Sequence, residues 1–186
     1  MRPLVTEINK SHIANKYVFL DTNVLNLMFR DKDAFNCILD VFSESYLTIE
    51  SLVRFEFLRD VFLPKQRELK ELFIDNEVIF FPSAEHQQLF NDAKENALAL
   101  SFIYAHKDVK SASFIDLMIA AKAVIHFPNA IIVTQNRKDF PAFLFDTVGV
   151  INYEEEKTRQ ISNYVIVSFN KENYKSAINS LEKVLG

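Results

Sequence analysis

The 186-residue sequence predicts an α/β fold, a three-layer α/β/α arrangement whose central sheet is mostly parallel. Two observations lead to this prediction. Short apolar runs typical of buried strands alternate with longer stretches typical of helices. The chain is also long enough, with 49% apolar residues, to bury a sizeable core. The character changes after residue 153, so we expect a main domain over 1–153 and a strand–helix appendage over 154–186.

Composition and charge exclude several classes of protein. Only 2 glycines are present, so glycine-rich phosphate loops of the P-loop or dinucleotide-binding type are unsupported. A single cysteine, Cys37, excludes a disulfide framework and any metal site built from several cysteines. The net charge of −4 argues against indiscriminate binding to nucleic acid, although it leaves room for a local basic face.

Targeting signals are missing from the printed sequence. Residues 1–16 contain no continuous apolar segment of the secretory kind, and no run approaches the roughly 18 apolar residues of a membrane span. We therefore expect a cytoplasmic protein without a membrane partner.

The predicted strands are short and rich in β-branched and aromatic residues. In order along the chain, the main domain carries them at Tyr17–Leu20, Tyr46–Ile49, Val78–Phe81, Ile131–Thr134 and Val148–Asn152.

The predicted helices fill the intervals between these strands. The stretch Ser113–His126 is apolar almost all round, which indicates a buried helix. Another helix is expected at Ser51–Leu63 and is ended by Pro64. Two more are expected at Lys65–Ile74 and at Ala84–Ala105.

The appendage is predicted from a second change of pattern. A charged connector leads to a strand over Ile161–Phe169 and then to a helix with an apolar stripe from Tyr174 to Leu185. Asn170 is the expected N-cap of that helix. The stripe must be buried against the main domain or against a second copy of the chain, so a homodimer is expected.

Acidic residues stand where strands and helices meet. Asp21 follows the first strand, in a turn that contains neither glycine nor proline. Glu56 lies in the helix after the second strand, Asp116 opens the buried helix, and Asp139 follows the strand that ends at Thr134. In a parallel sheet the carboxyl ends of the strands form one edge, where ligands usually bind, so the four acids can converge there.

Each acid also has an ordinary structural explanation. Glu56 can be a surface residue, alone or paired with Arg59, and Asp139 can be a loop residue or an N-cap. Ser113 and Asp116 resemble a capping box, with aspartate in place of the usual glutamate.

Taken together, the four acids favour a metal site. Four carboxylates in one crevice repel one another unless they are protonated or bound to cations. No cysteine or histidine accompanies them at ligand spacing, so the donors are hard oxygen atoms. Such a set suits Mg²⁺ or Mn²⁺ and is poor for zinc.

The segments "FLDTNVL", "RFEFL", "FIDLMIAAKAV" and "VTQNRKDF", in this order, resemble the PIN domain, the ribonuclease fold of VapC-type toxins. The resemblance covers roughly 17–153 and leaves the appendage outside. It implies a metal-dependent endoribonuclease that hydrolyses RNA and leaves a 5′-phosphate. It also implies an antitoxin protein as partner if the chain is the toxin of such a pair.

The resemblance also assigns roles to residues. It matches Asp21, Glu56, Asp116 and Asp139 to the family's acidic quartet, and Asn23, Thr134 and Asn136 to its supporting polar positions. We expect Asp21 and Asp116 to bind the metal directly, and Glu56 and Asp139 to bind it through water or to complete a second metal position. The cations expected to contact the RNA backbone are Arg54, Arg59, Arg137 and Lys138.

Other functions remain open from the sequence. Aspartyl-phosphatases also place an acid after the first strand, but they need a second acid two residues later, where this chain has Asn23. A receiver domain needs a further acid beside Asp21, and the preceding residues supply none. The main alternative is a PIN scaffold without turnover that binds RNA or protein, although such scaffolds usually lose one or more of the acids, and all four are present.

Overall fold

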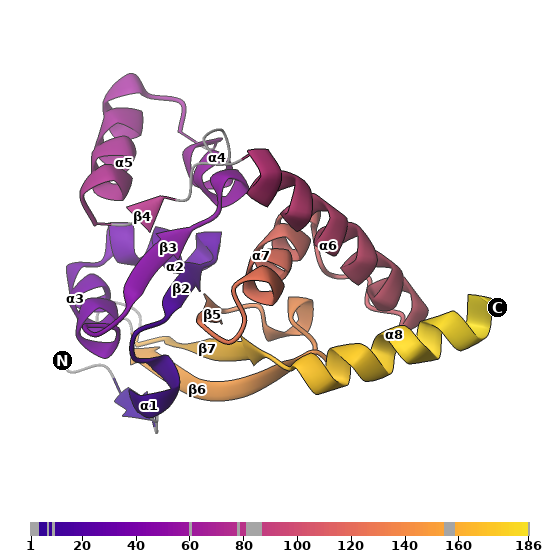
Figure 1. Cartoon of the computed structure of the whole chain (residues 1–186). Helices are drawn as coiled ribbons and strands as arrows, with labels where there is room; N and C mark the ends of the chain where they lie inside the picture. The colour runs from indigo at the N-terminus through magenta and orange to yellow at the C-terminus, as the bar shows by residue number, and fades with distance from the viewer. Residues whose placement is uncertain are drawn as a thin grey trace.

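The computed structural model describes residues 4–6, 8, 10–59, 61–77, 79–80, 87–154 and 159–185. Within them the chain is an α/β protein built on one mixed sheet with the strand order β1-β6-β7-β5-β2-β3-β4 (Figure 1). The strands are β1 (Leu4–Thr6), β2 (Tyr17–Leu20), β3 (Tyr46–Ile49), β4 (Ile79–Phe80), β5 (Ala130–Thr134), β6 (Phe145–Glu154) and β7 (Ile161–Phe169).

The sheet is only partly parallel, so the expectation of a mostly parallel sheet is corrected. Strands β4, β3, β2 and β5 run parallel to their neighbours. Beside β5 the direction reverses, because β7 pairs antiparallel with both β5 and β6, and β1 pairs antiparallel with β6. The carboxyl ends of β2, β3 and β5 therefore lie at one edge, as the placement of the acids requires.

The helices are α1 (Lys10–Ile13), α2 (Thr22–Arg30), α3 (Lys32–Val41), α4 (Ser51–Arg59), α5 (Pro64–Glu77), α6 (Gln87–His106), α7 (Phe114–Ile125) and α8 (Lys171–Leu185), with the short 3₁₀ helix η1 at Arg137–Asp139. Helices α4 to α8 agree in position with the predicted ones, whereas no ranges had been predicted for α1, α2 and α3.

Several boundaries differ from the predicted ones: β6 spans Phe145–Glu154 and not Val148–Asn152, and α5 ends at Glu77 and not at Ile74. Helix α4 ends at Arg59 and does not reach Leu63, which is 53% exposed. Pro64 begins α5, because a proline fits the first position of a helix, where its missing N–H has no helical partner. Some predicted ends, at 78, 81 and 84–86, lie outside the described residues.

The core lies where the sequence is most apolar. Residues 18–20 of β2 and all of β5 are buried, as expected of strands covered on both faces. Helix α7 packs beside α6 and buries most of its middle, Met118–Ala123 (Figure 1). This packing brings the N-terminal turn of α7, which carries Asp116, toward the edge of the sheet.

The segment 154–186 contributes a strand to the interior of the sheet. Strand β7 lies between β5 and β6, in a register that runs from Phe145 opposite Phe169 to Glu154 opposite Ile161. The N-cap predicted for α8 is confirmed, since the Asn170 side chain accepts a hydrogen bond from the Asn173 N–H at 2.9 Å. The hydrogen-bonded sheet thus continues across the predicted boundary at 153/154.

Candidate active site

Asp21 lies at the carboxyl end of β2, where the chain enters α2. Its extended backbone, with φ −75° and ψ 156°, makes it the N-cap of that helix, and Oδ1 accepts a hydrogen bond from the Thr22 N–H at 2.7 Å. Oδ2 accepts hydrogen bonds from Asn23 Nδ2 at 2.5 Å and from Thr134 Oγ1 at 2.6 Å. Both carboxylate oxygens are therefore held in place on a side chain that is only 5% exposed.

The predicted supporting residues tie the ends of β2 and β5 together. Asn23, at the start of α2, accepts a hydrogen bond through Oδ1 from the Gln135 N–H at 3.0 Å. Thr134, fully buried, accepts one through Oγ1 from the Asn136 N–H at 2.8 Å while it donates to Asp21. The two strand ends form one hydrogen-bonded unit with Asp21 at its centre.

Asp139 ends the η1 turn after β5 and is only 1% exposed. Its Oδ2 accepts a close hydrogen bond from Asn136 Nδ2, and its backbone oxygen accepts one from the Tyr104 hydroxyl of α6 at 2.9 Å. Its Oδ1 is buried without a hydrogen-bond partner among the described residues. A buried oxygen without a hydrogen bond lowers the folding stability by about 1–3 kcal/mol or more. Such groups often mark the place of a bound water or ion.

Glu56 reaches the same region from α4. The Thr22 hydroxyl donates a close hydrogen bond to Glu56 Oε2, so the glutamate contacts the residue directly after Asp21. Glu56 is half-buried and does not lie free on the helix surface. The contact with Thr22 therefore argues against Glu56 as a free surface residue.

Asp116 caps α7 and faces the other acids. The predicted capping box is confirmed: Ser113 Oγ accepts from the Asp116 N–H at 3.3 Å, and Asp116 Oδ2 accepts from the Ser113 N–H at 2.7 Å. The capping role and the site role are compatible, because this bond uses only one of the two carboxylate oxygens.

The electrostatics place Asp116 at the centre of the four acids. Burial raises the pKa of Asp116, hydrogen bonds from Ser113 lower it, and the charges of Asp139 and Glu56 raise it further. Burial also raises the pKa of Asp21 to about 6, helped by the charge of Asp116 and opposed by the hydrogen bond from Thr134. The structure thus brings Asp21, Glu56 and Asp139 within electrostatic reach of Asp116.

The donor set fits a hard divalent cation. All four groups offer oxygen atoms, the Asp139 Oδ1 lacks a partner, and none of the four forms a salt bridge within the described residues. In that same part of the chain no three acidic, histidine or cysteine side chains are already close enough to hold one ion. Mg²⁺ does not require three protein side chains around it, because it usually keeps several waters and binds proteins through one or two carboxylates.

The four basic residues expected to bind RNA lie in different surroundings. Arg137 is anchored to the start of β6, where Nη2 donates to the Phe145 carbonyl at 2.7 Å and Nε to Thr147 Oγ1 at 3.2 Å. Burial lowers its pKa, and its Nη1 is buried without a hydrogen-bond partner among the described residues. Lys138 beside it is exposed and available to a ligand.

Arg54 and Arg59 lie on α4, next to Glu56 in the sequence. Together with Arg67 of α5 they line a cavity of about 460 Å³. Arg54 forms an ion pair with Asp75 at 3.5 Å, and Arg67 forms one with Glu71 at 3.0 Å, so these two positive charges are partly balanced.

Two buried charges near the site were not among the predicted residues. Glu50 is 1% exposed at the end of β3 and accepts hydrogen bonds from Ser51 Oγ at 2.7 Å and the Leu52 N–H at 2.5 Å, so it caps α4. Lys122 is buried on α7, where burial lowers its pKa and the negative charge of Glu50 raises it. Both had a signal in the sequence: Glu50 follows a strand as Asp21 does, and Lys122 is the one basic residue in an apolar helix.

Comparisons with models of known families, with curated proteins and with solved structures gave no significant match. Among the described residues, no helix is both long enough and apolar enough to cross a membrane.

Proposed function

We propose that this chain is a metal-dependent endoribonuclease with a PIN-like fold, which hydrolyses RNA phosphodiester bonds. One observation carries the proposal: four carboxylates gather at the carboxyl edge of the parallel strands, where the charge of Asp116 acts on Asp21 and the charges of Asp139 and Glu56 act on Asp116. Protein folds rarely keep such repulsion without a function for it, and perturbed acids in a cluster are a mark of active sites.

The residues divide into those that would hold the ion and those that orient them. Asp116 and Asp21 would be the direct ligands, with Glu56 and Asp139 in contact through water or at a second position. The chemistry that Mg²⁺ or Mn²⁺ supplies in such sites is activation of water and neutralisation of phosphate charge.

The polar neighbours keep the acids ready for that ion. Thr134 and Asn23 fix the orientation of the Asp21 carboxylate, and Asn136 fixes that of Asp139. Residues that hydrogen-bond to metal ligands in this way matter, because removing one typically lowers metal affinity or activity about 10- to 100-fold.

The test is cleavage of labelled single-stranded RNA by purified protein with Mg²⁺, with Mn²⁺ or with chelator. We expect cleavage with either ion and none with chelator, and we expect no cleavage by Asp116→Asn. Glu182→Gln, an exposed acid on α8, is the matched control and should behave as wild type. Cleavage that continues in chelator would falsify the metal assignment, and RNA binding without cleavage would favour the non-catalytic scaffold.

The partner expected from the resemblance belongs to the same proposal. If the chain is the toxin of a toxin–antitoxin pair, its expression alone should slow growth, and a small neighbouring protein should copurify with it. Harmless expression of a demonstrably active nuclease, with nothing bound, would place it in RNA processing instead.

A further inference from the structure

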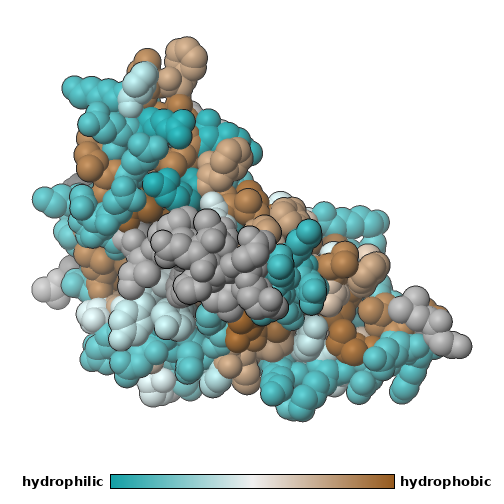
Figure 2. Space-filling view, turned by 45° about the horizontal axis from the view of Figure 1, so that its top comes forward, coloured by the Kyte–Doolittle hydropathy of each residue, from teal (hydrophilic) through white to brown (hydrophobic). Residues whose placement is uncertain are grey.

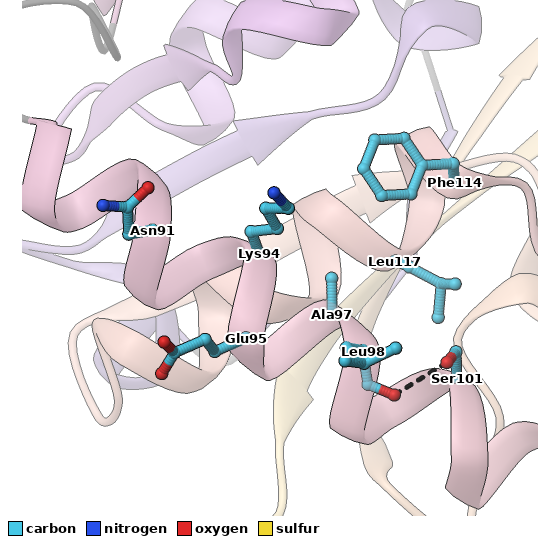
Figure 3. Close-up of a pocket in the computed structure, with 8 residues that line it drawn as sticks. All are labelled: Asn91, Lys94, Glu95, Ala97, Leu98, Ser101, Phe114 and Leu117. Atoms are coloured by element: carbon cyan, nitrogen blue, oxygen red, sulfur yellow. Dashed lines mark hydrogen bonds between the residues drawn. The ribbon is translucent and has the colours of Figure 1, made fainter.

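A groove between α6 and α7 lies next to the candidate active site. It has a volume of about 380 Å³, within the usual range of ligand pockets, and its walls are mostly apolar. Figure 3 shows the side chains that line it: Asn91, Lys94, Glu95, Ala97, Leu98 and Ser101 from α6, and Phe114 and Leu117 from α7.

Both helices of the groove are linked to the acids, α7 by carrying Asp116 and α6 by a hydrogen bond to Asp139. Phe114 and Leu117 flank Asp116 in the first turn of α7. On α6, Tyr104 lies three residues beyond Ser101 and donates its hydroxyl hydrogen to the Asp139 carbonyl. A molecule in the groove would therefore lie beside an RNA strand that is bound for cleavage at the four acids.

The chemistry of the groove suits one unpaired nucleobase. Phe114 is 57% exposed, and its ring stands beside the groove at the start of α7 (Figure 3). Lys94 extends on the same side and supplies a positive charge for a phosphate, although Glu95 beside it is acidic. An exposed aromatic ring with a nearby cation is the usual means by which proteins hold single-stranded nucleic acid.

We propose that this groove binds an unpaired base of the RNA substrate, stacked on Phe114, with Lys94 contacting the adjacent phosphate. The proposal rests on the proposed function, because it places the base next to the cleaved bond. It makes Phe114 a determinant of substrate binding, with no part in the chemical step.

The chain contains no tryptophan, which allows a direct test. Phe114→Trp introduces one indole in the groove, whose fluorescence a stacked base should quench. Phe102→Trp is the matched control, since Phe102 is also 57% exposed on α6 but does not line the groove. Single-stranded RNA is titrated into each variant in chelator, so that no cleavage is needed, and DNA of the same sequence is titrated in parallel.

We expect saturable quenching in Phe114→Trp and none in Phe102→Trp. RNA that quenches more strongly than DNA identifies the ribose as part of the recognition. Phe114→Ala should weaken RNA binding about 5- to 100-fold, the loss of one stacked base, and raise KM with little change in kcat. Lys94→Ala should make binding less sensitive to salt.

Three results would overturn the proposal: no quenching in Phe114→Trp at the highest RNA concentration, equal quenching in both variants, or a spectral shift that depends on protein concentration without RNA. The last would mean that a second copy of the chain covers the groove. The two proposals can fail separately. Cleavage without quenching removes the groove and keeps the nuclease, whereas quenching without cleavage at any metal concentration keeps the groove and removes the nuclease.

Discussion

The parallel part of the sheet, β4-β3-β2-β5, and the antiparallel part, β7-β6-β1, differ in what they bury. In the parallel part, buried acidic residues follow the carboxyl ends of the strands. These are Asp21, Glu50 and Asp139, all at most 5% exposed. The antiparallel part is held by a long register of strand pairs and by packed rings, with Phe169 in contact with Phe145 at 5.9 Å between ring centres. The parallel part therefore buries acidic side chains beside its apolar core, whereas the described strands of the antiparallel part bury apolar and aromatic ones.

Hydrophobic side chains also reach the surface over several helices. Figure 2 shows hydrophobic side chains reaching the surface over α4 and α5 and again over α6 and α8, on either side of the view. The exposed residues with the largest apolar side chains include Phe55, Phe62, Leu98, Phe102 and Phe114, all from α4, α6, α7 or the segment after α4. In the described residues, these surfaces flank the helices that carry Glu56 and Asp116.

The largest expected effect comes from breaking the antiparallel part. Phe169 packs its ring against Phe127, Phe145 and Tyr174. Phe169→Ala should lower the free energy of unfolding by about 3–5 kcal/mol, because it leaves a cavity in the core. Urea denaturation measures the loss, and RNA cleavage per folded molecule should stay near the wild-type value. A loss of cleavage larger than the loss of folded protein would contradict the separation of scaffold from site.

The next effect concerns the parallel part. Asp116→Asn keeps an oxygen that accepts the Ser113 capping bond but removes one negative charge from the cluster. The rate of cleavage should fall by more than about 100-fold. This is more than the loss expected when a residue that only hydrogen-bonds to a metal ligand is removed. Without metal, the melting temperature should stay the same or rise, because a carboxylate whose pKa is raised destabilises the fold when ionised.

A purely structural Asp116 predicts the opposite pattern. Loss of a negative charge at a helix N-terminus would cost up to about 1 kcal/mol, and activity would survive. An active but less stable Asp116→Asn would therefore remove this residue from the site and leave it as a cap.

A smaller effect should be visible in the pH dependence of stability. Because burial raises the pKa of Asp21 from 3.8 to about 6, the folded chain binds more protons than the unfolded chain between these values. Metal-free stability should fall as pH rises through this window, by about 2–3 kcal/mol from Asp21. The difference between wild type and Asp21→Asn isolates this contribution, and a difference that does not change with pH would show that Asp21 titrates normally.

The smallest effect tests the cap that starts α8. Asn170→Ala removes the hydrogen bond from the Asn173 N–H and should cost about 1 kcal/mol. Cleavage should not change, since α8 carries none of the four acids. Thermal melting measures the cost, and an effect on cleavage would show that α8 contributes to the site.

Local features of the fold could be predicted from the sequence. The strand before Asp21, the Ser113–Asp116 capping box and the Asn170 cap depend on neighbouring residues alone. The insertion of β7 between β5 and β6 could not be predicted, because the choice of strand partner depends on contacts far apart in the sequence.

The candidate site shows the same division. The acids were predictable by type and position, but the hydrogen bond from Thr22 to Glu56 and the bond from Tyr104 to the Asp139 carbonyl join separate elements. Arg137 illustrates the limit: its sequence neighbours suggested RNA, whereas its hydrogen bonds lead to β6.

The most direct test of the central claim is titration of Mn²⁺ into the metal-free protein, followed by calorimetry and by melting temperature. The account predicts saturable binding by wild type and by Glu182→Gln, with stabilisation of about 2.7 kcal/mol at a hundredfold excess over Kd. Asp116→Asn should bind much more weakly. Absence of binding to wild type, or equal binding by Asp116→Asn, would contradict the claim that these acids form a metal site.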